Sequence, residues 1–447
     1  MFDLSSLGIG PVTILVFGSM LILLVARVPL AFLTGIISIS LTVGWFSWET
    51  LPLVANRVYG FMNSYSLLAV PMFVLMAALL DQTGIAKDLY NAMWLFTRKL
   101  KGGVAIQTVI IGVFLAAISG IIGGETVLLG LLALPQMLRL GYSKNLAIGT
   151  CVSSGALGTM VPPSIVLIIY GLTASVSIGD LFTAAFVPAF MLAGLYIVYI
   201  ILYGMVKPDK VPSLSKEEID ANPIGRAQRL RAIRDIALPG FIAVTLLGSI
   251  YLGVASVTEA ASVGVIAVIL VAAYRREFRL AVLQSSLRTT MQTCGMIMWI
   301  GIGAYILVGV YNLVGGNRFI EQMILGLGWS PVAIIVVMML ILIFLGMFMD
   351  WIGIAMLTVP IFVPIIQTLG YDPVWFGILF CVNMQISFLS PPFGPGAFYL
   401  HSVAPEGITL VDIFRSVLPY ILMQALILAL LITFPQIALF MPNLLRG

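Results

Sequence analysis

The stretch LSPPFGPGAFYL, residues 389–400, lies at the end of a long apolar run and contains three prolines and two glycines. Proline lacks a backbone N–H and its ring clashes with the preceding turn, so a Pro-Pro pair interrupts a helix. A second pair occurs in MVPPSIVLIIYG, residues 160–171, again within an apolar run. The sequence therefore predicts two broken helices, over 145–171 and 374–400.

The composition indicates a polytopic membrane protein. The chain is 61% hydrophobic and 9% charged, whereas a soluble domain has about 25% charged residues. Apolar stretches of about 20 residues, each long enough to cross a bilayer, recur along the chain. The formal charge of +4 then bears on topology and does not indicate a nucleic-acid partner. The predicted spans are 11–26, 28–46, 65–82, 145–171, 181–204, 236–253, 256–274, 293–314, 374–400 and 410–440.

Two further apolar stretches, 104–138 and 333–367, are about 35 residues long and are interrupted near the middle. The interruptions are SGIIGG (119–124) and LGMFMDWIG (345–353). A long stretch with small residues at its centre favours a helical hairpin that enters and leaves the membrane on one side. A single long tilted span is the alternative.

The distribution of basic residues favours two re-entrant hairpins. Threading the chain with its N-terminus outside and both hairpins re-entrant leaves only Arg57, Arg318 and Arg446 outside, and the other 19 of the 22 Lys and Arg residues face the cytoplasm. A full crossing at either hairpin would flip every later segment and weaken this bias. We therefore expect both termini to be periplasmic and the first apolar stretch, which lacks a basic n-region, to be retained.

Three segments are expected to lie outside the membrane core. Residues 86–97 and 279–292 are amphipathic and are predicted to be arm helices along the cytoplasmic interface. Residues 205–235 form the one long polar stretch and are interpreted as a connector between two halves, with SKEE at 215–218 as a candidate capping box.

An internal repeat relates the two halves at a constant offset of 229 residues. The offset relates Pro162-Pro163 to Pro391-Pro392, Gly141-Tyr142 to Gly370-Tyr371, and Pro135 to Pro364. Downstream, GDLF (179–182) matches VDIF (411–414) after a small insertion. The threading puts the halves in opposite orientations. Inverted repeats with broken helices that meet near the midplane are typical of secondary transporters.

The breaks are candidate Na⁺ sites. A proline frees a backbone carbonyl, and in lipid a freed carbonyl must be satisfied, so the break must be buried or line a cavity. Polar side chains adjoin both pairs: Ser153, Ser154 and Thr159 before the first, and Asn383, Gln385, Ser387 and Ser390 before the second. The alternative is that both breaks are packing kinks.

Two acidic residues lie at the predicted hairpin breaks, Glu125 in the first and Asp350 in the second. They are not at equivalent repeat positions. Each is interpreted as a ligand for Na⁺, a proton carrier, or a hydrogen-bonding residue of the hairpin tip, because carboxylates inside membranes are rare and functional by default. Glu259, in SVTEAASVG, is expected to cap a helix.

An intramembrane protease is the main alternative from another class. The chain has one histidine, His401, and no H-E-x-x-H motif, which disfavours a zinc protease. GYD at 370–372 supplies a Tyr-Asp pair, but a partner G-x-G-D is missing. No phosphate-binding Gly-Lys-Ser/Thr loop is present, so nothing indicates direct use of ATP. We expect no enzymatic activity and no organic cofactor.

Several long stretches resemble the large (DctM-type) membrane subunit of tripartite ATP-independent periplasmic (TRAP) transporters, of the ion-transporter superfamily. They are GTMVPPSIVLIIYG, GYSKNLAIGTCVSSGALG, TEAASVG, GYDPVWFGILFCVNMQISFLSPPFGP and PMFVLMAALLDQTGIA, and the resemblance covers essentially the whole chain. Much of the family has S-G-S-A-x-A-D at the first hairpin tip. Here SGIIGGE matches at Ser119 and Gly120, with Glu125 in place of Asp and Ile121 in place of the second Ser. This departure indicates a different substrate branch.

The resemblance implies an all-α elevator-type transporter with inverted repeats, two re-entrant hairpins and two broken helices. The expected divisions are a first scaffold segment with an arm helix (1–103), a first transport half (104–180), scaffold helices (181–330), a second transport half (331–409) and a C-terminal scaffold helix (410–447). The expected partners are a small membrane subunit, a periplasmic substrate-binding protein and membrane lipid.

The resulting hypothesis is Na⁺-coupled uptake of an organic acid across a bacterial inner membrane. The alternative is a stand-alone Na⁺/carboxylate symporter without a binding protein. Candidate substrate-binding residues are Ser119, Gly120, Gly155, Pro162, Pro163, Asn383, Pro391 and Pro392. Candidate Na⁺ ligands are Ser119, Glu125, Ser153, Ser154, Gly346, Asp350, Asn383 and Ser387.

Overall fold

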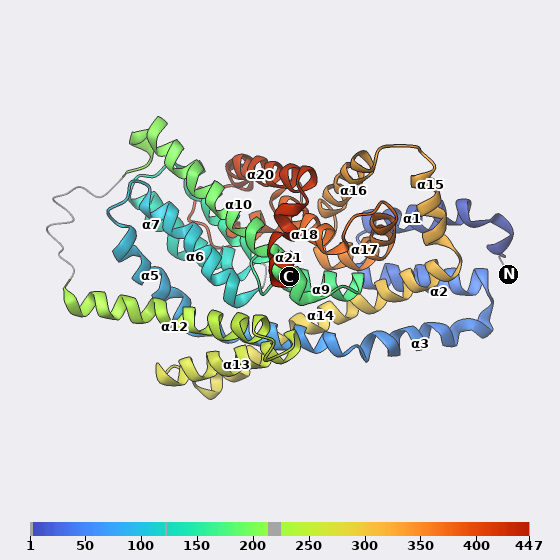
Figure 1. Ribbon diagram of the computed structural model, residues 1–447, viewed down its shortest axis with the longest axis horizontal. Coiled ribbons are helices and arrows are strands. Elements are labelled where there is room, and N and C mark those ends of the chain that lie inside the picture. Colours follow the sequence, from blue (N-terminus) through green and yellow to red (C-terminus); the bar gives the residue numbers. More distant parts are fainter. Residues whose placement is uncertain (1–2, 121–122, 213–224, 447) are drawn as a thin grey trace.

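The computed structural model describes residues 3–120, 123–212 and 225–446, and in these ranges the chain is helical and contains no β-strand. Figure 1 shows an elongated molecule with its N-terminus at one end. Helices α3, α12, α13 and α14 run along its lower edge, and α10, α16, α18 and α20 lie above them. The all-α fold class is confirmed.

The helices that flank the repeats include those along the lower edge of the molecule in Figure 1. They are α1 (Ile9–Val25), α2 (Leu30–Trp45), α3 (Leu51–Met62), α4 (Ala69–Gln82), α5 (Ile85–Thr97), α12 (Arg226–Tyr251), α13 (Val257–Tyr274), α14 (Leu280–Leu313) and α15 (Gly316–Leu325). Helix α14 is the central member, because α2, α3 and α4 all pack against it. Helix α13 begins with a capping box in which Glu259 accepts the backbone N–H of Ser256 at 2.7 Å, which confirms the capping role of Glu259.

The two repeats contain the same series of elements. The first has α6 (Gly103–Ser119), α7 (Gly124–Arg139), α8 (Lys144–Ala156), the 3-10 helix η4 (Leu157–Thr159), α9 (Ile165–Ala174) and α10 (Ile178–Val206). The second has α16 (Pro331–Gly346), α17 (Trp351–Thr368), α18 (Pro373–Leu389), α19 (Pro395–His401) and α20 (Leu410–Thr433). The helix α21 (Gln436–Arg446) follows. Both predicted broken helices are therefore present, as α8–α9 and α18–α19.

The 229-residue offset extends to the backbone. Gly141 and Gly370 both have a positive φ, 88° and 82°, after the preceding helix. The residues two positions later, Ser143 and Asp372, cap α8 and α18 with their side chains. Both Pro-Pro peptide bonds are cis. The repeat read from the sequence is thus a repeat of local structure as well.

The long helix α10 connects the starting points of α18 and α8. In its first turns, Leu181 packs so closely on α18 that a Cβ at Gly377 would lie 2.6 Å from its Cδ2 atom. In its last turn, the Tyr203 hydroxyl lies 3.2 Å from the Ser143 hydroxyl at the start of α8. The two broken helices therefore begin at opposite ends of a 29-residue helix.

Helix α20 makes the reciprocal connection. Its first turn lies at the start of α8, where Lys144 forms a 2.9 Å ion pair with Asp412. Its end lies at the start of α18, where the Trp375 indole donates to the carbonyl of Leu431 at 2.8 Å. Because α8 and α18 start at opposite ends and run toward each other, the repeats are inverted.

Both helix pairs that precede the broken helices have the geometry of hairpins. Tyr90 contacts both arms of the first pair: its carbonyl accepts from Gln107 near the start of α6, and its hydroxyl donates to Gln136 near the end of α7. In the second pair, Thr368 at the end of α17 donates to Glu321 of α15, which precedes the start of α16 by one short loop. Each pair therefore begins and ends on the same side of the molecule.

Six described helices are long and apolar enough to span a membrane: α10, α12, α13, α14, α17 and α20. The pair α4–α5 would make a seventh, although it bends by 63° at its break. Helices α1, α2, α6, α9, α16, α18 and α21 are apolar but shorter. The chain is a multi-pass membrane protein.

Two predicted elements are wrong in their boundaries. Residues 279–292 do not form a separate arm helix, because α14 runs without interruption from Leu280 to Leu313 and no proline intervenes. The predicted span 410–440 is divided into α20 and α21. Pro435 follows Phe434, whose φ of −126° and ψ of 76° end α20, as expected for a residue before proline.

The long polar connector is also partly helical. Within the predicted loop 205–235, α12 already begins at Arg226 and continues into the apolar segment. The candidate capping box at 215–218 lies outside the described residues. The 86–97 prediction corresponds to α5, which bends away from α4.

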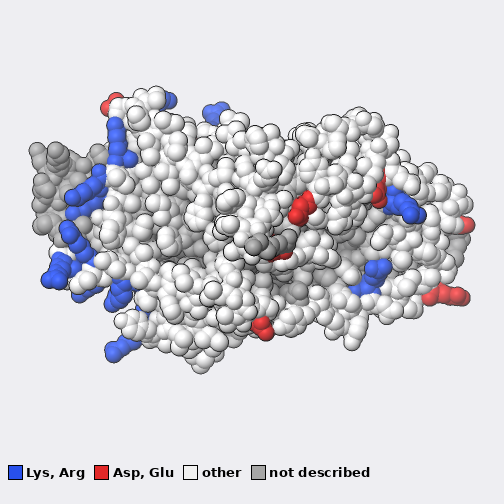
Figure 2. All heavy atoms as spheres, viewed as in Figure 1, with Lys and Arg blue, Asp and Glu red and all other residues white. Residues whose placement is uncertain are grey.

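Exposed basic side chains gather at one end of the molecule. Figure 2 shows Lys and Arg concentrated on the left of the view, over the ends of α5, α7, α10 and α12. The exposed basic residues of this region include Lys99, Lys101, Arg139, Lys207, Lys210, Arg226 and Arg229. Few basic side chains are visible in the right half of the same view.

Candidate functional site

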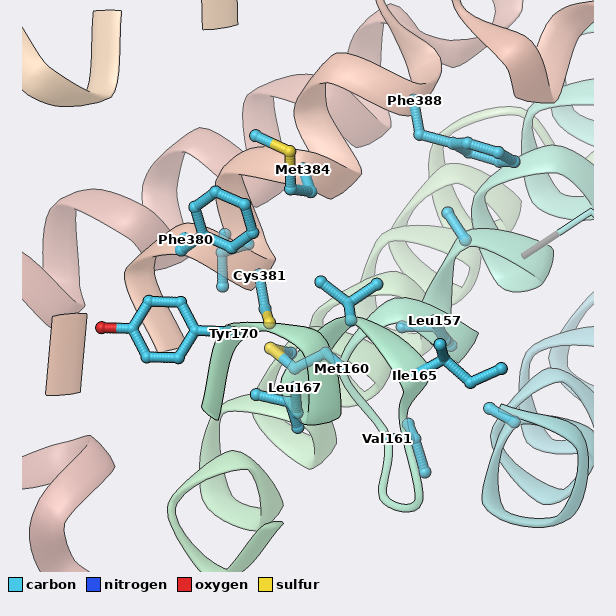
Figure 3. Packing of buried hydrophobic residues seen from close by; sticks show 14 of the residues in the cluster. Leu157, Met160, Val161, Ile165, Leu167, Tyr170, Phe380, Cys381, Met384 and Phe388 are labelled. Atoms are coloured by element: carbon cyan, nitrogen blue, oxygen red, sulfur yellow. The ribbon is translucent and has the colours of Figure 1, made fainter. Parts of the chain in front are cut away.

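The two broken helices pack on each other through a fully buried apolar contact. Figure 3 shows Met160, at the first break, beside Cys381 of α18, and Tyr170 of α9 beside Phe380. All four residues are completely buried, and the rings of Tyr170 and Phe380 have centroids 5.7 Å apart. Dense packing of this kind fixes the position of the two breaks relative to each other.

The first hairpin tip is attached to the first Pro-Pro break. The backbone N–H of Ile165 donates to the carbonyl of Gly120 at 3.3 Å. Gly120 has a φ of 60°, and a Cβ there would lie 2.4 Å from the carbonyl oxygen of Pro163. Only glycine fits this close approach without strain, so the sequence SG at the tip is required by the contact between tip and break.

Both hairpin tips and both broken helices meet at a small central cavity of about 100 Å³. Gly120 and Ile165 line it from the first repeat, and Asp350, Phe388 and Tyr399 from the second. The remaining wall comes from α14, through Thr293, Met296 and Ile297. The cavity therefore lies where the inverted repeats face the helices that flank them.

Asp350 lines this cavity and caps α17. Its side chain is exposed, and its Oδ2 atom accepts the backbone N–H of Ile352 at 3.2 Å. Of the three roles predicted for this carboxylate, the structure describes a hydrogen bond within the hairpin tip.

Glu125 is buried in the first turn of α7, with 4% of its surface exposed. Its Oε1 atom accepts a hydrogen bond from Ser119, and within residues 3–120, 123–212 and 225–446 its Oε2 atom has no partner. The carboxylate lies directly on η4, because a Cβ at Gly158 would be 2.6 Å from Oε2. A buried ionised carboxylate with an unsatisfied oxygen is strongly disfavoured unless a cation or a proton compensates it.

Further unpaired hydroxyls lie on α7 and α8 of the first repeat. Thr126 packs on α8 so closely that a Cβ at Gly155 would lie 2.2 Å from its Oγ1 atom. The hydroxyls of Thr126, Ser153 and Ser154 are buried and have no hydrogen-bond partner among the residues that the structure describes. We call Glu125 and these three residues the first polar cluster. Glu125 and Thr126 lie against Gly158 and Gly155, whereas Ser154 lies against Gly112 of α6.

The second polar cluster lies at the corresponding contact of α16 with α18. Asn383 is fully buried, and its amide nitrogen donates to the carbonyl of Met339 at 2.9 Å, while its Oδ1 atom has no partner. One turn later, the unpaired Ser387 hydroxyl lies against Gly346, where a Cβ would be 2.2 Å away. Both polar atoms of Gln385 are also unpaired.

The structure thus brings together most of the predicted residues in three places. Ser119, Glu125, Ser153, Ser154 and Gly155 belong to the first cluster, and Asn383, Ser387 and Gly346 to the second. Asp350 and Gly120 line the central cavity. The hydroxyls of Thr159 and Ser390 donate to backbone carbonyls, of Ala156 and Ile386.

The Pro-Pro pairs differ in their surroundings. Pro162 and Pro163 are buried, whereas Pro391 and Pro392 are exposed, and none of the four lines the central cavity. Thr126, Tyr399 and the α14 residues were not predicted as site residues. Thr126 follows Glu125 directly, which is the one signal in the sequence that could have indicated it.

The inverted repeats, paired hairpins and broken helices define a secondary-transporter architecture. The chain belongs to the family of the DctM component of tripartite ATP-independent periplasmic transporters, whose model matches residues 17–437. This family consists of membrane transporter permeases, which are not a class of enzyme.

Curated relatives extend over nearly the whole chain. The C4-dicarboxylate TRAP transporter large permease protein DctM of Vibrio cholerae is 30% identical over 97% of both chains. The ectoine TRAP transporter large permease protein TeaC of Halomonas elongata is 31% identical over 85% of this chain and 86% of its own. The isethionate TRAP transporter permease protein DctMQ of Oleidesulfovibrio alaskensis is 28% identical over 97% of this chain and 66% of its own.

A solved structure has the same fold at low sequence identity. The YdaH transporter of Alcanivorax borkumensis matches with a TM-score of 0.63, covering 93% of this chain and 97% of its own, at 14% identity. The fold is therefore that of a known membrane transporter.

Proposed function

We propose that this chain is the permease through which a TRAP transporter takes up an organic acid by Na⁺ coupling. The observation that carries the proposal is the pair of polar clusters around Ser154 and Asn383. Na⁺ prefers oxygen ligands, and each cluster holds buried oxygens that lack a hydrogen-bond partner in the described part of the chain. Buried polar atoms are paired in nearly all proteins, and unpaired ones call for a specific explanation such as an ion.

The clusters occupy corresponding places in the repeat. Position 154 plus the offset of 229 gives position 383, and both residues face the hairpin helix of their own repeat, where Gly112 approaches the Ser154 carbonyl and Met339 accepts from Asn383. One Na⁺ per cluster would restore the missing interactions. In the first cluster the ion would also compensate the charge of Glu125.

The central cavity is the proposed place of the substrate carboxylate. Its walls come from the two hairpin tips and from α14, so it opens and closes when the repeats move against the flanking helices. The volume of about 100 Å³ holds only a small group, and a whole organic acid would require the tips to separate. An elevator motion, in which the repeats slide along α14 while the flanking helices stay fixed, provides such a separation.

The orientation and partners follow from the same proposal. The basic end of Figure 2 is assigned to the cytoplasm by the positive-inside rule, with both termini periplasmic in a bacterial inner membrane. Both hairpins then re-enter the membrane. A small membrane subunit and a periplasmic binding protein are the proposed partners, and the binding protein is expected to determine much of the selectivity.

Uptake into proteoliposomes tests the proposal. The chain is reconstituted with the small subunit and the binding protein encoded beside it, and uptake of radiolabelled succinate and a panel of other organic acids is measured. We expect accumulation with an inward Na⁺ gradient and none when choline replaces Na⁺. Uptake that is independent of Na⁺ would overturn the coupling. Uptake without the binding protein would instead indicate a stand-alone Na⁺/carboxylate symporter.

A further inference from the structure

A second and larger cavity, of about 650 Å³, lies on the same boundary between the repeats and the flanking helices. Its walls come from α3, α14 and α15 on one side and from α9 and α17 on the other. Along α14, the central cavity touches residues up to Ile297 and the larger cavity begins at Tyr305. Eight helical residues correspond to about 12 Å, so the two cavities lie in series along one helix.

The larger cavity contains two arginines. Arg57 of α3 is half-buried, and Arg318 of α15 is exposed. The guanidinium of Arg57 lies across α14, where a Cβ at Gly309 would be 3.0 Å from its Cζ atom. Glycine at this position therefore leaves the space in which the side chain reaches the cavity.

Neither arginine has an ion pair within the described part of the chain. Glu321 also lines the cavity, and its carboxylate accepts a hydrogen bond from Thr368 at 2.8 Å. Two positive charges thus face one negative charge, which leaves the cavity with a net positive charge. Its volume is within the usual range for sites that bind small molecules.

A net positive charge is unusual on the outer side of the membrane, where the predicted threading places this cavity. The two arginines are two of the three basic residues that the predicted threading leaves on the outer side. Charged residues of membrane helices that line a water-filled cavity commonly mark the route of an ion or substrate. A cavity lined by one sign of charge raises the local concentration of the opposite sign and speeds its entry.

We infer that this cavity is an entrance vestibule in which Arg57 and Arg318 attract and orient an organic anion before it enters the central cavity. The inference rests on the proposed transport of an organic acid. In this inference the two arginines attract the anion into the vestibule and do not bind it in the central cavity, because neither lines that cavity. The headgroup of an anionic lipid has the same charge chemistry and is the other possible occupant.

Cysteine labelling tests the vestibule independently of transport. Thr173 lines the cavity from α9, and the Thr173→Cys variant is labelled with two methanethiosulfonates of similar size, one carrying a sulfonate and one a quaternary ammonium. The protein without the added cysteine gives the background from Cys151, Cys294 and Cys381. We expect the ratio of anionic to cationic labelling rates to fall about tenfold when Arg57→Gln and Arg318→Gln are combined.

Two matched controls accompany this measurement. The Arg57→Lys, Arg318→Lys pair keeps both charges and should leave the ratio within about twofold of its original value. Arg139→Gln removes one charge at the far, basic end and should also leave it unchanged. An unchanged ratio in the double Gln variant, or an equal fall in Arg139→Gln, would overturn the vestibule.

Two further experiments, labelling in vesicles of different lipid composition and an uptake assay, distinguish an organic anion from a lipid headgroup. The tenfold effect should be the same in phosphatidylcholine vesicles and in vesicles containing phosphatidylglycerol. Loss of the effect with phosphatidylglycerol would mean that a lipid headgroup fills the site, which contradicts the inference. In uptake assays, the double Gln variant should raise the KM about threefold to tenfold with Vmax within twofold. Uptake that is independent of Na⁺ would contradict the proposed Na⁺ coupling, whereas the labelling ratio would still test the charge of the vestibule.

Discussion

Ser154 and Asn383 are fully buried and occupy equivalent positions in the two inverted repeats, and each has a side-chain oxygen that no described residue hydrogen-bonds. Each lies eight residues, about two helical turns, before a Pro-Pro pair. A packing kink requires the prolines but gives no reason for unpaired polar side chains beside them at both places. The presence of unpaired buried oxygens beside both Pro-Pro breaks therefore favours Na⁺ sites over packing kinks.

The glycines beside these clusters should not tolerate alanine. In Gly346→Ala, the added Cβ would lie 2.2 Å from the Ser387 hydroxyl, and in Gly155→Ala it would lie 2.8 Å from the backbone nitrogen of Thr126. Overpacking of this kind destabilises by about 1–3 kcal/mol. We expect both variants to lose most Na⁺-driven uptake, measured at equal amounts of protein in the membrane.

A matched glycine provides the control for these substitutions. Gly248 lies inside α12, and a Cβ there would meet no atom within 4 Å. Gly248→Ala should leave uptake unchanged and raise stability by about 1 kcal/mol at most. If Gly155→Ala and Gly346→Ala behave like Gly248→Ala, the tight contacts between hairpins and broken helices are not required for transport.

Asp350→Asn separates the roles of the second hairpin tip. The amide oxygen can still accept from the backbone N–H of Ile352, so the cap of α17 is kept while the negative charge is lost. We expect uptake at limiting Na⁺ to fall sharply with normal expression, because the charge lines the central cavity. A loss of pH dependence would indicate a proton instead of Na⁺. Wild-type uptake would leave Asp350 as a capping residue alone.

Glu125→Gln tests whether the first cluster needs a charge. The amide can keep the hydrogen bond from Ser119, and its other polar atom would still face η4 near Gly158. If Na⁺ compensates the carboxylate, the half-activating Na⁺ concentration should rise about tenfold, the usual scale for a lost buried ionic partner. An unchanged Na⁺ titration, with normal folding by thermal unfolding, would mean that a proton neutralises Glu125.

The orientation of the chain is tested by labelling single cysteines from either side. Arg276 lies at the end of α13 and Arg318 in α15. Impermeant reagents should label Arg318→Cys from the outside of intact cells, and Arg276→Cys only after the membrane is opened. Labelling of Arg276→Cys in intact cells would reverse the orientation.

The broken helices and the repeat could be predicted from the sequence because their signals are local. A Pro-Pro pair interrupts a helix wherever it occurs, and the Gly-Tyr turns before α8 and α18 need a positive φ that glycine supplies. The division of 410–440 was not predicted, although Pro435 lies within this span and α20 ends just before it.

The rest of the site depends on contacts between distant segments. That Thr126 packs on Gly155, or that α14 supplies a wall of the central cavity, follows from tertiary packing and leaves no periodic signal. Helix α14 is one continuous helix although its first half is amphipathic and its second apolar. The hydrophobic periodicity changes between the two halves, but the helical backbone continues without a break.

The Na⁺ dependence of uptake in Ser154→Ala and Asn383→Ala is the most direct test of ion binding at the breaks. Loss of one ligand should cost about 1–3 kcal/mol and raise the half-activating Na⁺ concentration roughly tenfold or more. Ser390→Ala is the matched control, since the Ser390 hydroxyl already donates to the Ile386 carbonyl at 2.7 Å. We predict a shifted Na⁺ titration for the first two variants and an unshifted one for the third. If Ser154→Ala and Asn383→Ala fold normally and retain the wild-type titration, the broken helices are kinks and Na⁺ binds elsewhere.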